Sequence, residues 1–371
     1  MRSIMLVSVP DSGIVNASGG GEPIEPGSSL GSQRADRSSI PANDQTPLYG
    51  YECVYRGCAH LWGAAPAKPP AEGPRSSGPA LFSPSVPAPE SKVGEDLGMA
   101  VDVIAIDWSG RIDGERRTIW TAHAREGRLI SLENGRRRAE VIDHVIAEAA
   151  RFERLVVGLD FAFSFPAWFL TSRGLTSVHA LWEIVGVEGE EWLKDCPPPF
   201  WGKPGRKKPI SESHYRATER EFPAVAGVQA KSVFQVGGAG AVGTGSLRGM
   251  PFLGRLHDAG FSVWPFDASG WPRVVEIYPR LLTGPVIKSN QSGRERYLED
   301  RFPALDGDMA DLAASSEDAF DAAVSALVMS ANAKGLEELA PDGELPGRLE
   351  GRIWCPPTPS ASTGPQVSQQ D

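Results

Sequence analysis

The chain has 371 residues, of which 41 are glycine and 32 are proline, about 11% and 9% of the total. Typical globular proteins hold roughly 7% glycine and 5% proline, so part of this chain is not ordinary core. The 37 basic and 47 acidic residues give a net charge of −10, which excludes a general, basic nucleic-acid binder. No stretch approaches the ~18 apolar residues of a membrane span, so we expect no membrane partner. Four cysteines in so long a chain exclude a disulfide-stapled scaffold.

The first part of the chain, residues 1–98, carries much of the unusual composition and has no sustained helical or strand period. Such a segment buries too little apolar surface to offset chain entropy, so we expect a disordered extension there and a disordered tail over 356–371. Met99 directly precedes the first predicted strand, and we hypothesise that it is the natural start of the protein. The apolar run Ile4–Val9 is too short for a signal peptide, which favours a cytoplasmic protein with reduced cysteines.

The ordered region, residues 99–355, opens with a pattern of buried strands. Val101–Asp107 is apolar until it ends in an acid, as is Leu155–Asp160, and both patterns are typical of strands buried on two faces. Between them the sequence predicts two strands joined by a short turn, followed by an amphipathic helix: 117–123, 127–132 and 136–152.

The second half of the ordered region begins with residues 161–231, which look like an irregular insertion. After it the sequence predicts further strands and two helices: strands over 232–236, 262–266 and 273–278, and helices over 246–259 and 315–334. The order of strand, hairpin, helix, strand and then α/β units predicts a mixed sheet flanked by helices.

Acidic residues occupy positions in these elements where apolar residues are expected. Asp107 and Asp160 end buried strands, at the sheet edge where α/β proteins usually place a site. Glu276 interrupts an apolar strand, and burying its charge costs several kcal/mol unless it is paired or bound to a metal. In the last predicted helix Asp321 shares a face with apolar residues, and Asp318 lies one turn earlier.

Four or five carboxylates that converge on one point repel one another, and hard divalent cations remove that repulsion. We therefore predict an Mg²⁺ or Mn²⁺ site held by Asp107, Asp160, Glu276 and Asp321, with Asp318 as an auxiliary group. Glu276 would be a ligand or would orient the attacking water. Two such ions activate a water and stabilise the leaving oxygen of a phosphodiester. No group of His or Cys residues is expected to compete as a transition-metal site.

Each acid also has a structural alternative. Asp107 and Asp160 can cap the turns that follow their strands, and Glu276 can pair with an arginine such as Arg280. Asp318 stands at a capping-box position in the first helical turn, where the helix dipole favours a carboxylate. The sequence leaves these alternatives open.

A glycine-rich segment, Gly237–Gly245, contains the spacing G-x-G-x-x-G at Gly238, Gly240 and Gly243. A predicted strand precedes it and a predicted helix follows, which is the setting of loops whose backbone N–H groups approach phosphate. We expect either a phosphate-contacting loop or a purely structural turn, and a true dinucleotide fingerprint is the third possibility.

Basic residues of the insertion form one compact patch near Trp201. With that tryptophan they can grip a phosphate backbone and stack a base, or they can be a solvated loop. The candidate phosphate-binding residues are the patch together with one later lysine: Lys203, Arg206, Lys207, Lys208 and Lys231.

Several short segments together resemble the predicted RNase H-like nuclease family, domain-of-unknown-function family 429. They are spread over most of the ordered region: 106–110 (IDWSG), 157–161 (VGLDF), 199–205 (PFWGKPG), 232–238 (SVFQVGG), 275–279 (VEIYP) and 318–323 (DAFDAA). The resemblance implies an RNase H-like fold and metal-dependent hydrolysis of a phosphodiester, nucleic acid included. It also implies that Asp107, Asp160, Glu276 and Asp321 hold the metal. The bulky segment Phe161–Pro166 departs from the family pattern, which leaves the substrate shape open.

Two other functions stay open. A sugar-kinase or actin-like phosphotransferase shares the core topology, and there the glycine-rich loop would hold nucleotide phosphates. That fold needs a duplicated core, for which the ordered region is short. A protein that binds nucleic acid or nucleotide without turnover is the non-enzymatic alternative.

Overall fold

A computed structural model of the chain describes residues 100–356. The predictions for residues 1–98 and for the tail after residue 356 lie outside this part. Within it, no helix combines the length and the apolar character needed to cross a membrane.

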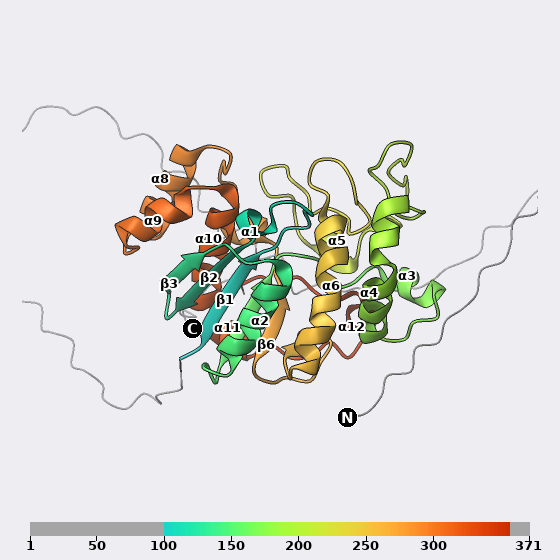
Figure 1. The fold of residues 1–371 in the computed structure, drawn as a ribbon, viewed down its shortest axis with the longest axis horizontal. Helices are drawn as coiled ribbons and strands as arrows, with labels where there is room; N and C mark the ends of the chain where they lie inside the picture. Colours follow the sequence, from blue (N-terminus) through green and yellow to red (C-terminus); the bar gives the residue numbers. More distant parts are fainter. Residues whose placement is uncertain (1–99, 357–371) are drawn as a thin grey trace, which may run out of the picture. The chain divides into compact units, whose positions relative to one another are not determined.

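One mixed sheet organises the described residues (Figure 1). Its six strands, in the spatial order β3-β2-β1-β4-β6-β5, are β1 (Asp102–Asp107), β2 (Trp120–Arg125), β3 (Arg128–Glu133), β4 (Leu155–Leu159), β5 (Ser262–Val263) and β6 (Arg273–Glu276). Strand β2 is antiparallel to β1 and β3, and the other neighbouring strands run parallel. The prediction of a mixed sheet flanked by helices is confirmed.

Helices cover both faces of the sheet (Figure 1). Along β1 the side chains alternate: Ile104 and Ile106 pack with α2 and α6, while Val103 and Ala105 pack with α10. This alternation follows from the two-residue period of a strand, and it explains why β1 reads as a continuous apolar run. The three covering helices are α2 (Arg138–Ala149), α6 (Val242–Asp258) and α10 (Glu317–Ala331).

The segment 161–231, expected to be irregular, contains a long helix. Helix α4 packs against α6 because its apolar residues recur at helical spacing, with Leu181, Trp182 and Val185 buried in the core. The many tryptophans, prolines and charged residues of the segment make this helical repeat of apolar residues hard to recognise in the sequence. Its ordered elements are α3 (Ala167–Ser172), α4 (Val178–Asp195), a 3-10 turn η2 (Glu212–His214) and α5 (Ala217–Glu221).

The predicted strand over 232–236 is wrong. That segment is a turn, from which Gln235 forms a single parallel bridge to Trp201. The helix after it begins at Val242, four residues before its expected start. Short helices complete the described chain: α1 (Glu115–Thr118), α7 (Pro279–Thr283), α8 (Gln291–Arg301), α9 (Gly307–Ala314), α11 (Ala333–Glu337) and α12 (Gly347–Glu350).

Candidate functional site

The carboxyl ends of β1 and β4 bring Asp107 and Asp160 side by side. Ile106 is in register with Leu159, and the N–H of Asp160 donates to the carbonyl of Ile106 at 3.1 Å. The strand alternation that turns Ala105 towards α10 turns Asp107 the same way. Neither carboxylate has a hydrogen-bond or ion-pair partner in residues 100–356, so neither caps the turn that follows it.

Helix α10 lies across this edge and supplies the other two aspartates. Its N-cap is Ser316, whose hydroxyl accepts from the N–H of Ala319 at 3.0 Å. Asp318 therefore lies in the first turn but not at the capping-box position, which Ala319 occupies. Asp321 follows one turn later and is only 9% exposed, so it faces the sheet as predicted.

The four aspartates form an electrostatically unfavourable cluster. Burial raises the pKa of Asp160 to about 8, and the charges of Asp321, Glu276 and Asp318 add to the rise. Burial and the charges of Asp160, Asp321 and Asp318 also hold the pKa of Asp107 well above its usual value. A pKa of about 8 leaves the Asp160 carboxyl group protonated at neutral pH, and a nearby cation would favour its ionised form.

Lys288 provides the one positive charge that contacts this aspartate cluster in the described chain. Its ammonium donates to Oδ2 of Asp321 and lowers the pKa of Asp107, Asp160 and Asp321. The second oxygen of Asp321, Oδ1, is buried without a hydrogen-bond partner within residues 100–356. An unpaired buried carboxylate oxygen is costly, so the cluster has capacity for a further cation.

Glu276 departs from the predicted metal set. It is in register with Leu159 on β4, and both lie on the face opposite to α10, since the neighbours Val275 and Ile277 pack with that helix. Its carboxylate accepts two bonds from Arg216, at 2.5 and 2.8 Å, and one from the N–H of Phe163 at 2.9 Å. Glu276 is thus committed to a buried ion pair, and its partner is not Arg280.

Arg216, which the sequence did not single out, is the centre of that network. It is 1% exposed and also bonds Glu219 at 2.8 Å and the carbonyl of Glu350 at 3.0 Å. Although burial opposes its charge, the carboxylates of Glu219 and Glu276 raise the pKa of Arg216. Its 60-residue separation from Glu276 leaves no local sequence signal.

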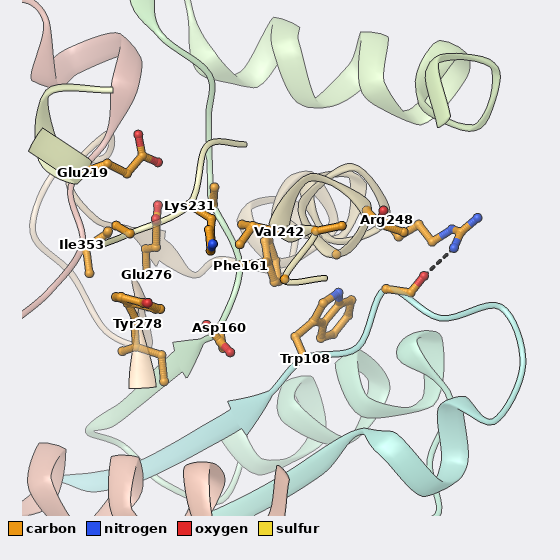
Figure 2. Close-up of a pocket in the computed structure, with 18 of the residues that line it drawn as sticks. Trp108, Asp160, Phe161, Glu219, Lys231, Val242, Arg248, Glu276, Tyr278 and Ile353 are labelled. Carbon is orange, nitrogen blue, oxygen red and sulfur yellow. Dashed lines mark hydrogen bonds between the residues drawn. The ribbon is translucent and has the colours of Figure 1, made fainter. Parts of the chain in front are cut away.

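A cavity of about 690 Å³ opens beside the cluster, and Asp160 forms part of its wall (Figure 2). Lys231 and Tyr278 line it as well, with residues from the start of α6. Lys231 has no hydrogen bond or ion pair in the described part of the chain, so its charge is available to a ligand. Arg248 also lines the wall but is paired with Glu190 at 2.7 and 2.8 Å. The cavity is large enough for a nucleotide-sized group.

The glycine-rich segment has a mainly structural role in the described chain. A Cβ on Gly243 would lie 2.2 Å from the carbonyl oxygen of Val233, so close backbone packing requires glycine there. Gly238 and Gly240 have the positive φ values 79° and 69°. Of the three motif glycines, Gly240 lines the cavity and lies beside Lys231.

The basic patch lies apart from the cavity, because none of its residues lines the wall. Lys203 and Arg206 instead bond the carbonyls of Lys194 and Asp195 at the end of α4, at 3.2 and 3.4 Å. Cations stabilise this negative end of the helix dipole. Lys208 lies over the rings of Trp201 and Tyr215, and Lys207 is exposed.

A histidine cluster elsewhere contradicts the expectation that no such group exists. His179, His257 and Asp267 offer ligand atoms that all lie within 4.8 Å of one another. These residues are separated by up to 88 positions, so no sequence spacing marks them.

Comparison with protein-family models, curated proteins and solved structures finds no match to this chain. The geometry of the aspartate cluster and its cavity therefore carries the functional argument.

Proposed function

We propose that this protein is an Mg²⁺- or Mn²⁺-dependent hydrolase of phosphodiesters, acting on nucleic acid or a related substrate. The observation that supports it is the convergence of Asp107, Asp160, Asp318 and Asp321 from three separate elements beside an open cavity. Gathering four partly buried carboxylates costs a protein stability, because their charges repel one another and lose hydration. A cation-binding role explains why the protein keeps this arrangement.

The proposal includes an RNase H-like fold. Its support is the strand order, in which a hairpin of β2 and β3 follows β1, and β4 then returns parallel to β1. The last long helix, α10, lies against β1 and β2 and carries the two further aspartates. The sequence resemblance to the nuclease family described above points the same way.

The residues present fit a hard divalent ion. Within residues 100–356, Oδ1 of Asp321 is a buried oxygen without a hydrogen-bond partner. In the same part of the chain, the carboxylates of Asp107 and Asp160 make no hydrogen bond or ion pair. Oxygen ligands of this kind suit Mg²⁺ and Mn²⁺. Asp107, Asp160 and Asp321 would hold the ions, with Asp318 as an auxiliary ligand. When bound, such ions lower the pKa of a water and stabilise charge on the leaving oxygen.

Other residues of the chain would position the substrate. Lys231 lines the cavity and has no ion-pair partner among residues 100–356, so its ammonium would bind a substrate phosphate. Val242 and Thr244 line the same wall at the start of α6, which has no side-chain cap, and the positive end of this helix favours an anion. The pair of Glu276 and Arg216 would fix the wall between β6 and α5 rather than contact a metal.

Cleavage of a mixed panel of DNA, RNA and junction substrates with Mn²⁺ tests this function. We expect cleavage by the wild-type chain and a loss of at least about 100-fold in Asp107→Asn and Asp160→Asn, because each removes a metal ligand. Asp311→Asn, an exposed aspartate on α9, is the matched control and should retain full activity. Equal cleavage by all variants would show a contaminating nuclease and contradict the proposal.

The same panel, combined with binding assays for ATP and nucleic acid, separates the alternative functions. ATP binding without cleavage would favour a sugar-kinase or actin-like phosphotransferase, although the described residues form a single sheet rather than a duplicated core. Metal-independent binding of nucleic acid without turnover would favour the non-catalytic protein.

A further inference from the structure

Two helices and a turn bring a second set of ligand atoms together, far from the aspartate cluster. His179 lies in the first turn of α4, His257 in the last turn of α6, and Asp267 follows β5. Helix α6 lines the cavity from Val242 to Arg248, and His257 lies nine residues beyond Arg248, about 14 Å along the helix axis. The set is therefore independent of the proposed active site.

The three side chains point at one another. Nε2 of His179 lies 3.0 Å from Oδ1 of Asp267, and Nδ1 of His257 lies 3.0 Å from Oδ2 of the same carboxylate. The imidazole centroids are 4.4 Å apart. Around a tetrahedral ion with bonds of about 2.0–2.1 Å, neighbouring ligand atoms are roughly 3.3 Å apart, so small shifts convert these contacts into a coordination shell.

The surroundings hold the ligands in place and leave one side open. The N–H of Val263 donates to Oδ2 of Asp267 at 2.8 Å, and His179 packs edge-on against the buried Trp182 at 4.9 Å. The side chains of His179 and His257 are 35% and 42% exposed, so an ion and a water ligand can reach them. Outer contacts of this kind orient metal ligands.

From this geometry we propose that His179, His257 and Asp267 bind a transition-metal ion such as Zn²⁺. Two imidazoles and one carboxylate suit Zn²⁺, Co²⁺ or Ni²⁺ and differ from the all-oxygen set of the aspartate cluster. The ion would cross-link α4, α6 and the turn after β5. Its function is to stabilise the packing of the long helix of the 161–231 segment on the rest of the domain.

Zinc titration of the tag-free full chain tests this site by calorimetry and thermal unfolding. We expect His179→Gln and His257→Gln each to lose one equivalent of Zn²⁺ relative to wild type. At a Zn²⁺ concentration 100-fold above its dissociation constant, the wild-type Tm should rise by about 5 °C more than that of either variant. His123→Gln is the matched control, because it removes a different His–Asp pair, joined at 2.9 Å to Asp102.

Co²⁺ provides a readout that does not depend on the stability of the variants. Binding to the wild-type chain should produce the visible absorption of a Co²⁺ ion with nitrogen and oxygen ligands. In Asp267→Asn the affinity for Co²⁺, followed by this absorption, should be at least tenfold weaker. Any Co²⁺ bound by thiolates elsewhere in the chain has a separate near-ultraviolet charge-transfer band. Equal Zn²⁺ stoichiometry in wild type, His179→Gln and His257→Gln would overturn the proposal, as would a wild-type Tm that Zn²⁺ leaves unchanged.

Discussion

At the scale of single residues, the cluster is defined by which carboxylates lack partners. Asp107 and Asp160 accept no hydrogen bond within residues 100–356, and Oδ1 of Asp321 is buried without one. Glu276, by contrast, has both oxygens bonded to Arg216. This difference supports the proposed metal binding by the aspartates, whereas Glu276 is committed to its ion pair with Arg216.

Asp160→Asn is expected to change how stability depends on pH. The pKa of Asp160 is about 8 in the folded chain and 3.8 in a model compound. Between these values the folded state holds a proton that the unfolded state has lost, so metal-free wild type loses stability as pH rises from about 4 to about 8. The variant lacks this loss, and its stability advantage should therefore grow with pH and level off above 8.

Urea unfolding at a series of pH values in EDTA measures this difference, and Asp311→Asn serves as the control with the wild-type trend. Excess Mn²⁺ should raise the stability of wild type at pH 8 but leave that of Asp160→Asn unchanged, because the ion needs the ionised carboxylate. A constant difference between variant and wild type across this pH range would be inconsistent with the raised pKa.

Lys288 is expected to tune the pH range of activity. Its charge lowers the pKa of Asp107, Asp160 and Asp321, so Lys288→Met should raise those pKa values. The acid limb of the Mn²⁺-dependent cleavage profile should then shift upward by about one pH unit. Lys334→Met, at an exposed lysine on α11, should leave the profile in place. An unshifted profile for Lys288→Met would contradict this role.

At the scale of elements, the 161–231 segment and the chain after it build the cavity wall onto the sheet. Arg216, just before α5, joins Glu276 on β6 to the carbonyl of Glu350 on α12. Close backbone packing between Gly243 on α6 and Val233 holds the turn over 232–236 against that helix. The bonds of Arg216 link segments that are distant in sequence and set the shape of the wall.

Arg216→Met should destabilise the protein by about 3–5 kcal/mol, because it leaves buried carboxylates uncompensated. The double variant with Glu276→Gln should lose less than the sum of the two single losses. Arg116→Ala, which breaks the exposed pair with Glu140, should cost less than about 1 kcal/mol. Denaturant unfolding of the four proteins in the cycle measures the coupling, and strictly additive losses would refute the network.

Two glycines of α6 make a matched pair. Gly243→Ala places a Cβ 2.2 Å from a backbone oxygen and should cost about 1–3 kcal/mol, whereas a Cβ on Gly254 meets nothing within 4 Å. Gly254→Ala should instead stabilise the helix by up to about 1 kcal/mol. Thermal unfolding compares them, and equal effects would mean that Gly243 is not in close contact.

At the scale of the whole molecule, the mixed sheet could be predicted from the sequence because its main strands depend on local pattern. The pattern of buried strands that end in acids predicted that Asp107 and Asp160 lie at one edge of the sheet. The apolar stripe of α10 predicted that Asp321 is turned away from water. The role of Glu276 could not be predicted in this way, because it depends on the sheet face to which its side chain points. Its partner Arg216 also lies 60 residues away. For the same reason Lys288 and the histidine cluster left no sequence signal.

The central claim is that a divalent ion binds between the ends of β1, β4 and α10. Anomalous diffraction from crystals soaked in Mn²⁺ tests it most directly, because manganese is located without reference to activity. We expect a peak within coordination distance of Asp107 and Asp160, with Asp321 as a further ligand, and no such peak in Asp160→Asn. Manganese bound only away from Asp107 and Asp160, or absent at saturating concentration, would contradict it.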